Sequence, residues 1–372
     1  MKISGNTTQV QSVCTEEPKT KKKSNFLSIL AGYGACTAVT FGSEKMSSFA
    51  YNKFSTSLDN AQKTGLYTPE RSISLFEASG LAQKGCRLNN FSETEFPNLE
   101  HRLGFIDNFN NKMKDYYEKS ISKARLQDKV KAVIKNEKAL EKLQDEGVKM
   151  KIVEKMSWKL NGCNYSSSNI KSLYSNIKQE LIEQGVENPS EKEIADIAKR
   201  ISATIKTFSR YKKKGGAVFL PAFNDINLNL NNSGVVLAHE LGHAKTFNSG
   251  ILSKVWTYVS AFAPRVAPIA LLAAILCKPK EKRDKDQGFI GKTFGFIKDN
   301  AVAISAISLT PQLLEEGMAS VKGYNIAKKV LPKKALKHLP KAYGTAFLTY
   351  AVAALGTVLA TFAADKARNA TC

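Results

Sequence analysis

Ala238-His239-Glu240-Leu241-Gly242-His243-Ala244 contains a complete H-E-x-x-H motif. On an α-helix, residues four positions apart share one face, so His239 and His243 can bind a single metal ion. Glu240 then lies beside the ion, where it can take a proton from a water molecule. The chain has only 4 histidines in 372 residues, and chance would produce the motif about 0.004 times in such a composition. The stretch therefore predicts a zinc site with Glu240 as its catalytic base.

The residues before the motif predict a small β element. Residues 217–220 form a short apolar run, and residues 225–231 alternate between polar and apolar side chains. Ser233 is suited to cap the helix that carries the motif. A strand, a turn and a metal-binding helix are the context expected for a zincin, in which a strand edge can pair with an extended peptide. We expect a mainly α fold, with a helical, membrane-associated zincin-like core and a short β element before the H-E-x-x-H helix.

A catalytic zinc needs a third protein ligand, and the sequence limits where it can come from. The metzincin position, ten residues after the first histidine, is Ser249, and no acidic residue occurs between His243 and Glu281. Acids in the lysine-rich loop that follows are expected to be solvated. Glu315 and Glu316 stand at the end of an apolar segment and open a predicted helix, a position that a cation would explain. Favourable capping of that helix is the alternative.

Residues 217–325 resemble the membrane-integrated gluzincin peptidases typified by HtpX and the CAAX prenyl protease. Those enzymes place H-E-x-x-H after a short strand, and two membrane segments then lead to an E-x-x-A-D motif. Glu316, Ala319 and Ser320 match this motif with Ser in place of Asp. The resemblance implies a zinc endopeptidase acting on protein or peptide, with Glu316 as the third ligand. It also implies that Ser320 replaces a carboxylate that orients a ligating histidine.

Several apolar segments predict a multi-pass or membrane-associated protein. The segment 26–42 follows a basic cluster, as in a signal anchor, and 344–364 is the strongest candidate for a membrane span. Segment 301–314 is short, which fits a re-entrant or partly buried helix better than a full span. A buried or interfacial helix is the alternative for 26–42, and a buried, alanine-rich helix of a soluble core is the alternative for 344–364. The candidate segments are 26–42, 256–277, 301–314 and 344–364.

The sequence divides into three regions. Residues 1–100 are predicted to form a polar tail, the candidate membrane segment and an irregular stretch over 43–100. Residues 101–210 have the pattern of basic, charged helices, with a break at Gly147 and with Ser190 as the N-cap of a helix over 191–208. Residues 211–372 form the metallopeptidase-like region.

The charge and the cysteine content argue against some binding partners and some kinds of metal site. The chain carries 55 Lys and Arg against 33 Asp and Glu, a net charge of +22. The lysines flank apolar segments, which fits membrane lipid as a partner, and no nucleic-acid fingerprint accompanies them. The six cysteines include no C-x-x-C pair, which argues against a cysteine zinc site and a disulfide framework. The alternative function is a non-catalytic membrane scaffold with a structural or vestigial zinc site.

Overall fold

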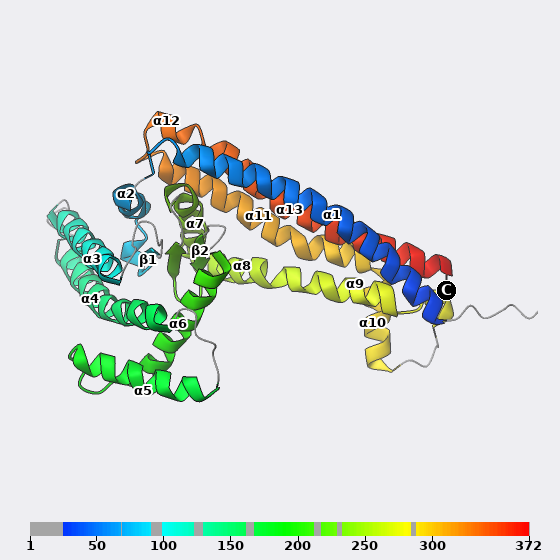
Figure 1. Ribbon diagram of the computed structural model, residues 1–372, viewed down its shortest axis with the longest axis horizontal. Helices are drawn as coiled ribbons and strands as arrows, with labels where there is room; N and C mark the ends of the chain where they lie inside the picture. Colours follow the sequence, from blue (N-terminus) through cyan, green and yellow to red (C-terminus); the bar gives the residue numbers. More distant parts are fainter. Residues whose placement is uncertain are drawn as a thin grey trace, which may run out of the picture.

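The computed structural model describes residues 25–67, 69–90, 99–122, 129–160, 167–211, 217–228, 233–283 and 288–371. The fold is mainly α with one three-stranded sheet before the motif helix, as the sequence predicts. Figure 1 shows two parts: a head of short helices and strands at one end, and an elongated bundle of long helices. The predicted tail before residue 25 lies outside the described residues.

The head contains the sheet, the motif helix and an arm of charged helices. Its elements are α2 (Pro69–Ser79), η1 (Ala82–Lys84), β1 (Arg87–Asn90), α3 (Leu99–Ser122), α4 (Lys129–Leu160), α5 (Ser167–Glu183), α6 (Glu191–Tyr211), β2 (Ala217–Leu220), β3 (Asp225–Leu228) and α7 (Ser233–Phe247).

The bundle contains the long apolar helices and the connections between them. Its elements are α1 (Asn25–Gln62), α8 (Ile251–Phe262), η3 (Ala263–Arg265), α9 (Val266–Leu276), η4 (Lys280–Lys282), α10 (Phe289–Asp299), α11 (Ala301–Ala327), α12 (Lys333–Leu336) and α13 (Leu339–Thr371). Figure 1 shows α1, α9, α11 and α13 running side by side away from the head, while α10 turns across their far end.

The sheet has the order β1-β3-β2, with β1 parallel and β2 antiparallel to β3. The predicted strands at 217–220 and 225–228 are confirmed, and 229–232 lie outside the described residues. Although polar and apolar residues alternate along β3, all four of its residues are buried. Asp225 is paired within the protein, because its Oδ2 lies 3.1 Å from Nη1 of Arg200 on helix α6.

Three sequence predictions about helices need correction. The stretch over 43–100 is not irregular, because α1 continues to Gln62 along α13 and α2 and β1 follow. Gly147 does not break α4. A Cβ there would lie 2.5 Å from Nδ2 of Asn110, so this glycine permits a close approach between helices. The short segment 301–314 belongs to the 27-residue helix α11.

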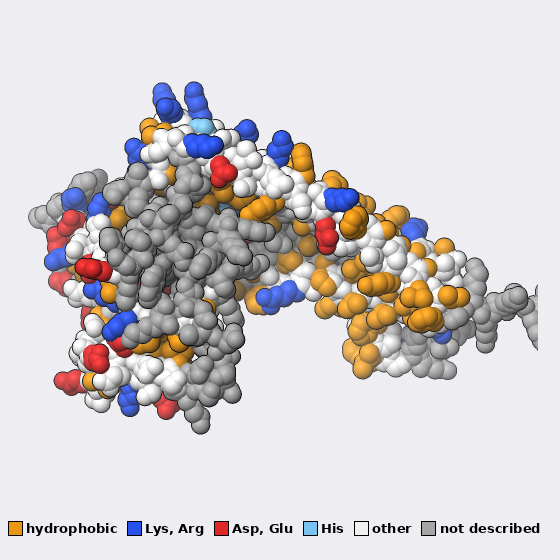
Figure 2. All heavy atoms as spheres, in the orientation of Figure 1, with side chains coloured by type: hydrophobic (Ala, Val, Ile, Leu, Met, Phe, Trp, Pro, Cys, Tyr) orange, Lys and Arg blue, Asp and Glu red, His pale blue; other side chains and the backbone are white. Residues whose placement is uncertain are grey.

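Three helical stretches are long and apolar enough to span a membrane: Asn25–Ala61, Ile251–Leu276 and Lys333–Thr371. They contain the predicted segments 26–42 and 344–364, and all of 256–277 except Cys277. Where they pack together the bundle core consists mostly of small side chains, while large apolar side chains point outward (Figure 2). The core residues are Cys36, Ala270, Ala274, Ile275, Ala301, Ala360 and Ala364.

Candidate metal centre

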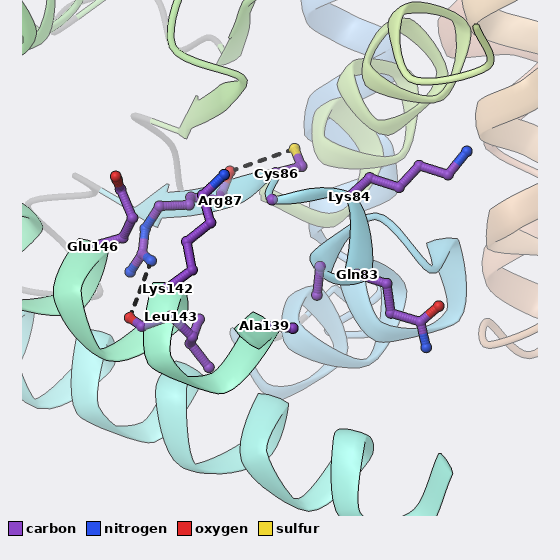
Figure 3. Close-up of a pocket in the computed structure, with 10 residues that line it drawn as sticks. Gln83, Lys84, Cys86, Arg87, Ala139, Lys142, Leu143 and Glu146 are labelled. Carbon is purple, nitrogen blue, oxygen red and sulfur yellow. Dashed lines mark hydrogen bonds between the residues drawn. The ribbon is translucent and has the colours of Figure 1, made fainter. Parts of the chain in front are cut away.

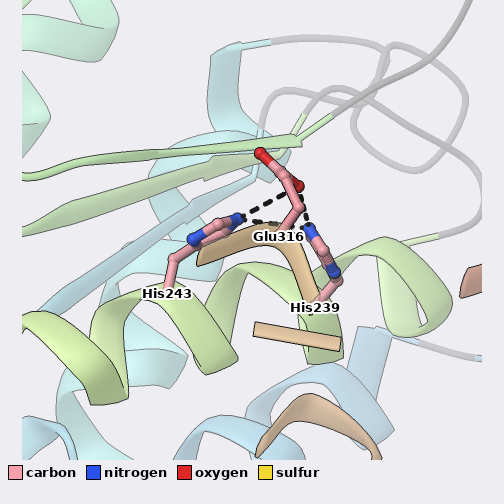
Figure 4. A group of neighbouring side chains, drawn as sticks. All are labelled: His239, His243 and Glu316. Atoms are coloured by element: carbon pink, nitrogen blue, oxygen red, sulfur yellow. Dashed lines mark hydrogen bonds and ion pairs between the residues drawn. The ribbon is translucent and has the colours of Figure 1, made fainter. Parts of the chain in front are cut away.

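Helix α7 from the head and helix α11 from the bundle bring together the three predicted ligands. Figure 4 shows the side chains of His239, His243 and Glu316 pointing toward one another. Nε2 of His239 lies 3.1 Å from Oε2 of Glu316 and 3.2 Å from Nε2 of His243. Nε2 of His243 lies 3.6 Å from the same carboxylate oxygen. The three side chains are 12–14% exposed, so the group is largely shielded from water but reachable.

The spacing of these three atoms fits a zinc ion. Zinc binds imidazole nitrogen and carboxylate oxygen at about 2.0–2.1 Å with tetrahedral geometry, which places neighbouring donor atoms about 3.3 Å apart. The three measured separations of 3.1, 3.2 and 3.6 Å bracket that value. Two neutral imidazoles and one carboxylate are also the donor types that zinc prefers. The group therefore fits three corners of a tetrahedron, and a fourth corner is left for water or substrate.

Each histidine uses its other ring nitrogen to contact α11. Nδ1 of His239 lies 3.1 Å from Oγ of Ser320, and Nδ1 of His243 lies 3.1 Å from Oε1 of Glu315. Nε1 of Trp256 on α8 donates to Oε2 of Glu315 at 2.8 Å. Hydrogen bonds of this kind fix the tautomer and the orientation of a ligating imidazole. Ser320 thus lies where the resemblance implies a residue that orients a ligating histidine. Glu315, the other candidate for the third ligand, contacts the second histidine through Nδ1.

Glu315 and Glu316 do not open a helix, and the capping explanation for them is wrong. They lie in the second half of α11, more than three turns from its first residue. Because the helix turns 100° per residue, their side chains point to different sides of the histidine pair. Glu316 faces both Nε2 atoms, whereas Glu315 faces Nδ1 of His243.

Glu240 is buried beneath the edge of the sheet. Its Oε2 accepts a hydrogen bond of 2.7 Å from the backbone N–H of Phe219 in β2, the edge strand. Burial raises the pKa of Glu240, and the nearby His243 and His239 act in the opposite direction. The anchored carboxylate and the raised pKa suit a group that must both accept and return a proton. No local sequence pattern predicts the contact with Phe219.

The pKa of His243 shows the demand for positive charge at this position. Burial acts to lower the pKa, but the hydrogen bonds to Glu315 and Glu316 outweigh it and raise the pKa to about 10. A metal ion binds the neutral form of an imidazole, so metal affinity at this position should depend on pH.

Two glycines allow α7 and α11 to approach closely enough for the ligands to meet. A Cβ on Gly242 would lie 2.0 Å from the backbone O of Ala319, and a Cβ on Gly323 would lie 2.2 Å from the backbone O of Ala238. Neither position has room for a methyl group. Gly242 is an unspecified position within H-E-x-x-H, so the motif alone does not predict this requirement.

Three other polar residues, Asp299, Tyr324 and Tyr343, do not belong to the group of three candidate ligands. Asp299 pairs with Arg283 through Oδ2 and Nη1 at 2.9 Å, far along the bundle. Tyr324, two turns after Glu316, packs against the head core. The ring of Tyr343 from α13 lies beside His239, with 5.7 Å between centroids, and its hydroxyl donates to the backbone O of Val235 at 3.1 Å. Tyr343 therefore packs against the ring of the first histidine and is itself tied to α7.

A separate pocket of about 260 Å³ lies between η1, β1 and α4. Figure 3 shows Lys142 and Arg87 among its lining residues. Nη1 of Arg87 donates to the backbone O of Leu143 at 3.4 Å, and burial raises the pKa of Cys86 well above its ordinary value. The guanidinium thus ties β1 to α4, and the thiol is held in its unreactive protonated form.

The chain matches no protein-family model, no curated protein and no solved structure. The grouping of His239, His243 and Glu316 is therefore the feature of the molecule that bears on its function.

Proposed function

We propose that this chain is a membrane-bound zinc endopeptidase. His239, His243 and Glu316 would hold the ion, and Glu240 would act as general base. The observation that carries the proposal is the spacing of the three donor atoms, 3.1–3.6 Å, in a group whose two imidazoles are also held through Nδ1. Chance clustering of polar side chains would not reproduce both layers of contacts.

Zinc held by these residues supplies Lewis acidity, which lowers the pKa of a water molecule toward about 7 and polarises a carbonyl group. Glu240 accepts the proton of the attacking water and delivers it to the leaving amine. The Phe219 N–H holds Oε2 of Glu240, so Oε1 is the oxygen that handles the proton. Because β2 is an edge strand beside Glu240, an extended segment of a protein substrate can pair with it.

The outward-facing apolar side chains support insertion of the bundle into a lipid bilayer. Three helical stretches have the necessary length and composition. Large side chains such as Leu355 and Leu359 on α13 are 53% and 46% exposed. An apolar surface of this extent needs a covering, and acyl chains provide one. The site then lies where the head meets the bundle.

The decisive experiment compares metal content and proteolysis in the full chain reconstituted in nanodiscs. Glu240→Gln should bind one zinc per chain as the wild type does, and cleavage of an unfolded protein such as casein should fall by about 100-fold to 10,000-fold. Glu316→Ala should lose both zinc and cleavage. Glu281→Gln, in the loop at the far end of the bundle, is the matched control and should change neither property.

The results separate the enzyme from a scaffold. Equal proteolysis by Glu240→Gln and wild type would refute the proposed mechanism. One bound zinc without cleavage in the wild type, together with loss of thermal stability in His239→Ala, would favour a structural zinc in a membrane scaffold. Absence of zinc from all variants would refute the metal site itself.

A further inference from the structure

The apolar surface of the bundle ends in lysines near the head. On α1, exposed Phe49 is followed by Lys53, whose Nζ lies 5.4 Å from the Phe49 ring centroid. On α11, Val321 is 63% exposed and Lys322 follows it. On α13, Lys341 precedes the exposed Phe347. We define the lysine collar as Lys53, Lys245, Lys254, Lys322, Lys328, Lys329, Lys333, Lys334, Lys337 and Lys341.

Helix packing brings the collar lysines of α1, α11 and the start of α13 to within about two turns of one another along the bundle. Gly356 on α13 packs against Ser43 on α1, and Ser305 on α11 bonds Thr361 on α13 through their hydroxyls at 3.2 Å. Helices α1 and α11 both run antiparallel to α13. Counting from these two contacts toward the head therefore brings Lys53 on α1, Lys322 on α11 and the start of α13 to nearly the same height. Figure 2 shows Lys and Arg side chains gathered over α12 and the adjoining helix ends, with apolar side chains following along the bundle.

The charge of the collar is not neutralised by the protein. Residues 241–280 and 317–364, which carry nine of the ten collar lysines, contain no Asp or Glu. Elsewhere cations do have acidic partners: Lys151 pairs with Asp107 at 2.6 Å, and Lys155 pairs with Glu180 at 2.6 Å. Among the described residues, no collar lysine has a carboxylate within 4.0 Å.

Lys322 of the collar has a neutral partner instead of an acidic one. Nζ of Lys322 donates to Oγ1 of Thr246 at 2.8 Å, a neutral group that leaves the charge in place. Such a concentration of unpaired positive charge favours an anionic partner.

We propose that the lysine collar binds the headgroups of anionic phospholipids and thereby fixes the depth of the metal site in the bilayer. The position of the collar, directly beside exposed apolar side chains on several helices, favours a lipid surface over a nucleic acid, because only a lipid offers phosphate and acyl chains together. Glu316 precedes Lys322 by six residues, a rise of about 9 Å along α11. A collar at the headgroups therefore places the site just below them.

This inference rests on insertion of the bundle but not on peptide hydrolysis. The test uses full-length protein carrying Trp158→Phe, which leaves Trp256 as the only tryptophan. Trp256 lies on α8 one turn or less from Lys254, at the level of the site. Protein is reconstituted in nanodiscs of phosphatidylcholine with brominated phosphatidylglycerol or with brominated phosphatidylcholine. Quenching of Trp256 then reports the relative affinity for the two headgroups.

We expect the anionic lipid to be favoured at least about tenfold at 50 mM salt, because each lysine close to an anionic surface strengthens binding by about fivefold. The preference should fall at 500 mM salt. Replacing Lys328, Lys329, Lys333 and Lys334 with Gln should reduce the preference to about twofold or less. The matched control replaces Lys114, Lys138, Lys178 and Lys192 of the head with Gln, which changes the net charge equally and should leave the preference intact.

Three outcomes would overturn the proposal. The first is equal quenching by both lipids in the wild type. The second is an equal loss of preference in the collar and control variants, which would indicate only the net charge of the chain. The third is reversal of the preference by a duplex oligonucleotide at equimolar concentration, which would assign the collar to nucleic acid. Resistance of both variants to alkaline carbonate extraction shows separately that the bundle is inserted, and casein cleavage is scored independently.

Discussion

The head and the bundle bury opposite kinds of side chain. The head encloses large apolar residues such as Phe76 and Phe109, and in the described part of the chain only Tyr174 and Ile182 among its large apolar residues are exposed. The bundle encloses alanines and exposes Phe, Leu and Ile. This contrast fits the proposal that water surrounds the head and acyl chains surround the bundle. The metal centre takes ligands from both parts.

The joint between the two parts is the most sensitive feature. Gly242→Ala places a methyl group 2.0 Å from the backbone O of Ala319, so α7 and α11 must separate. We expect a loss of at least about 3 kcal/mol of stability together with loss of zinc binding, measured by thermal unfolding and metal analysis. Gly317→Ala on α11, the partner helix, meets no atom closer than 3.9 Å, and it should retain zinc. Zinc binding by Gly242→Ala would show that the close approach is dispensable.

The contrast in solvent can be tested by placing the same charge on each part. Leu355 on α13 and Tyr174 on α5 are both exposed, at 53% and 39%. Arg at position 355 should cost about 3 kcal/mol because it faces acyl chains, which reduces membrane insertion by about 100-fold. Arg at position 174 faces water and should change stability by less than about 0.5 kcal/mol. The fraction of each variant that resists alkaline carbonate extraction measures its membrane insertion. An equal fraction for the two variants would contradict the distinction between the head and the bundle.

Orientation of the second histidine depends on the bundle. Glu315→Ala leaves Nδ1 of His243 without its partner on α11, and zinc affinity should fall by about 10-fold to 100-fold. Trp256→Phe removes only the hydrogen bond to Glu315 and should have a smaller effect. Competition with a fluorescent zinc chelator measures both affinities. Loss of all zinc in Glu315→Ala, with retention in Glu316→Ala, would show that Glu315 is the third ligand and that Glu316 is not.

The smallest expected effect lies in the head, far from the joint. Ser190 caps α6, accepting the N–H of Glu193 at 3.2 Å, and its own N–H donates to Glu193 at 3.0 Å. Ser190→Ala should cost about 1 kcal/mol without affecting zinc. The hydrogen bonds from the Ser190 backbone and hydroxyl lower the pKa of Glu193, so their contribution is present above the ordinary carboxyl pKa. It is lost as the pH falls through the lowered value, and the difference between wild type and variant should shrink there in thermal unfolding.

The sequence predicted those features that depend on local patterns. The H-E-x-x-H spacing placed both histidines on one face of α7, and the cap at Ser190 and the strands at 217–220 and 225–228 are confirmed. Residue patterns alone could not decide whether Glu315 or Glu316 is the third ligand, because the two have the same side chain and are adjacent in the sequence. The resemblance to the gluzincin motif was needed to select Glu316.

Features that depend on contacts between distant segments were not predictable. The extension of α1 to Gln62 is stabilised by packing along α13 rather than by its own periodicity. Pairing of β1 with β3 joins segments more than 130 residues apart. Gly242 and Gly323 have no local signal, since each is required only by the backbone of the opposite helix. The same holds for the Phe219 N–H that holds Glu240.

Helix α11 is continuous from Ala301 to Ala327, and it carries Glu316 on the same rod that packs against α9 and α13. The carboxylate lies fifteen residues from the far end of that rod, a lever arm of about 22 Å. A tilt of about 5° around the far end would move the carboxylate by about 2 Å, which is the length of a metal–ligand bond. If the bundle is inserted as proposed, a bilayer that changes the tilt of its helices would therefore change the separation of the three donors.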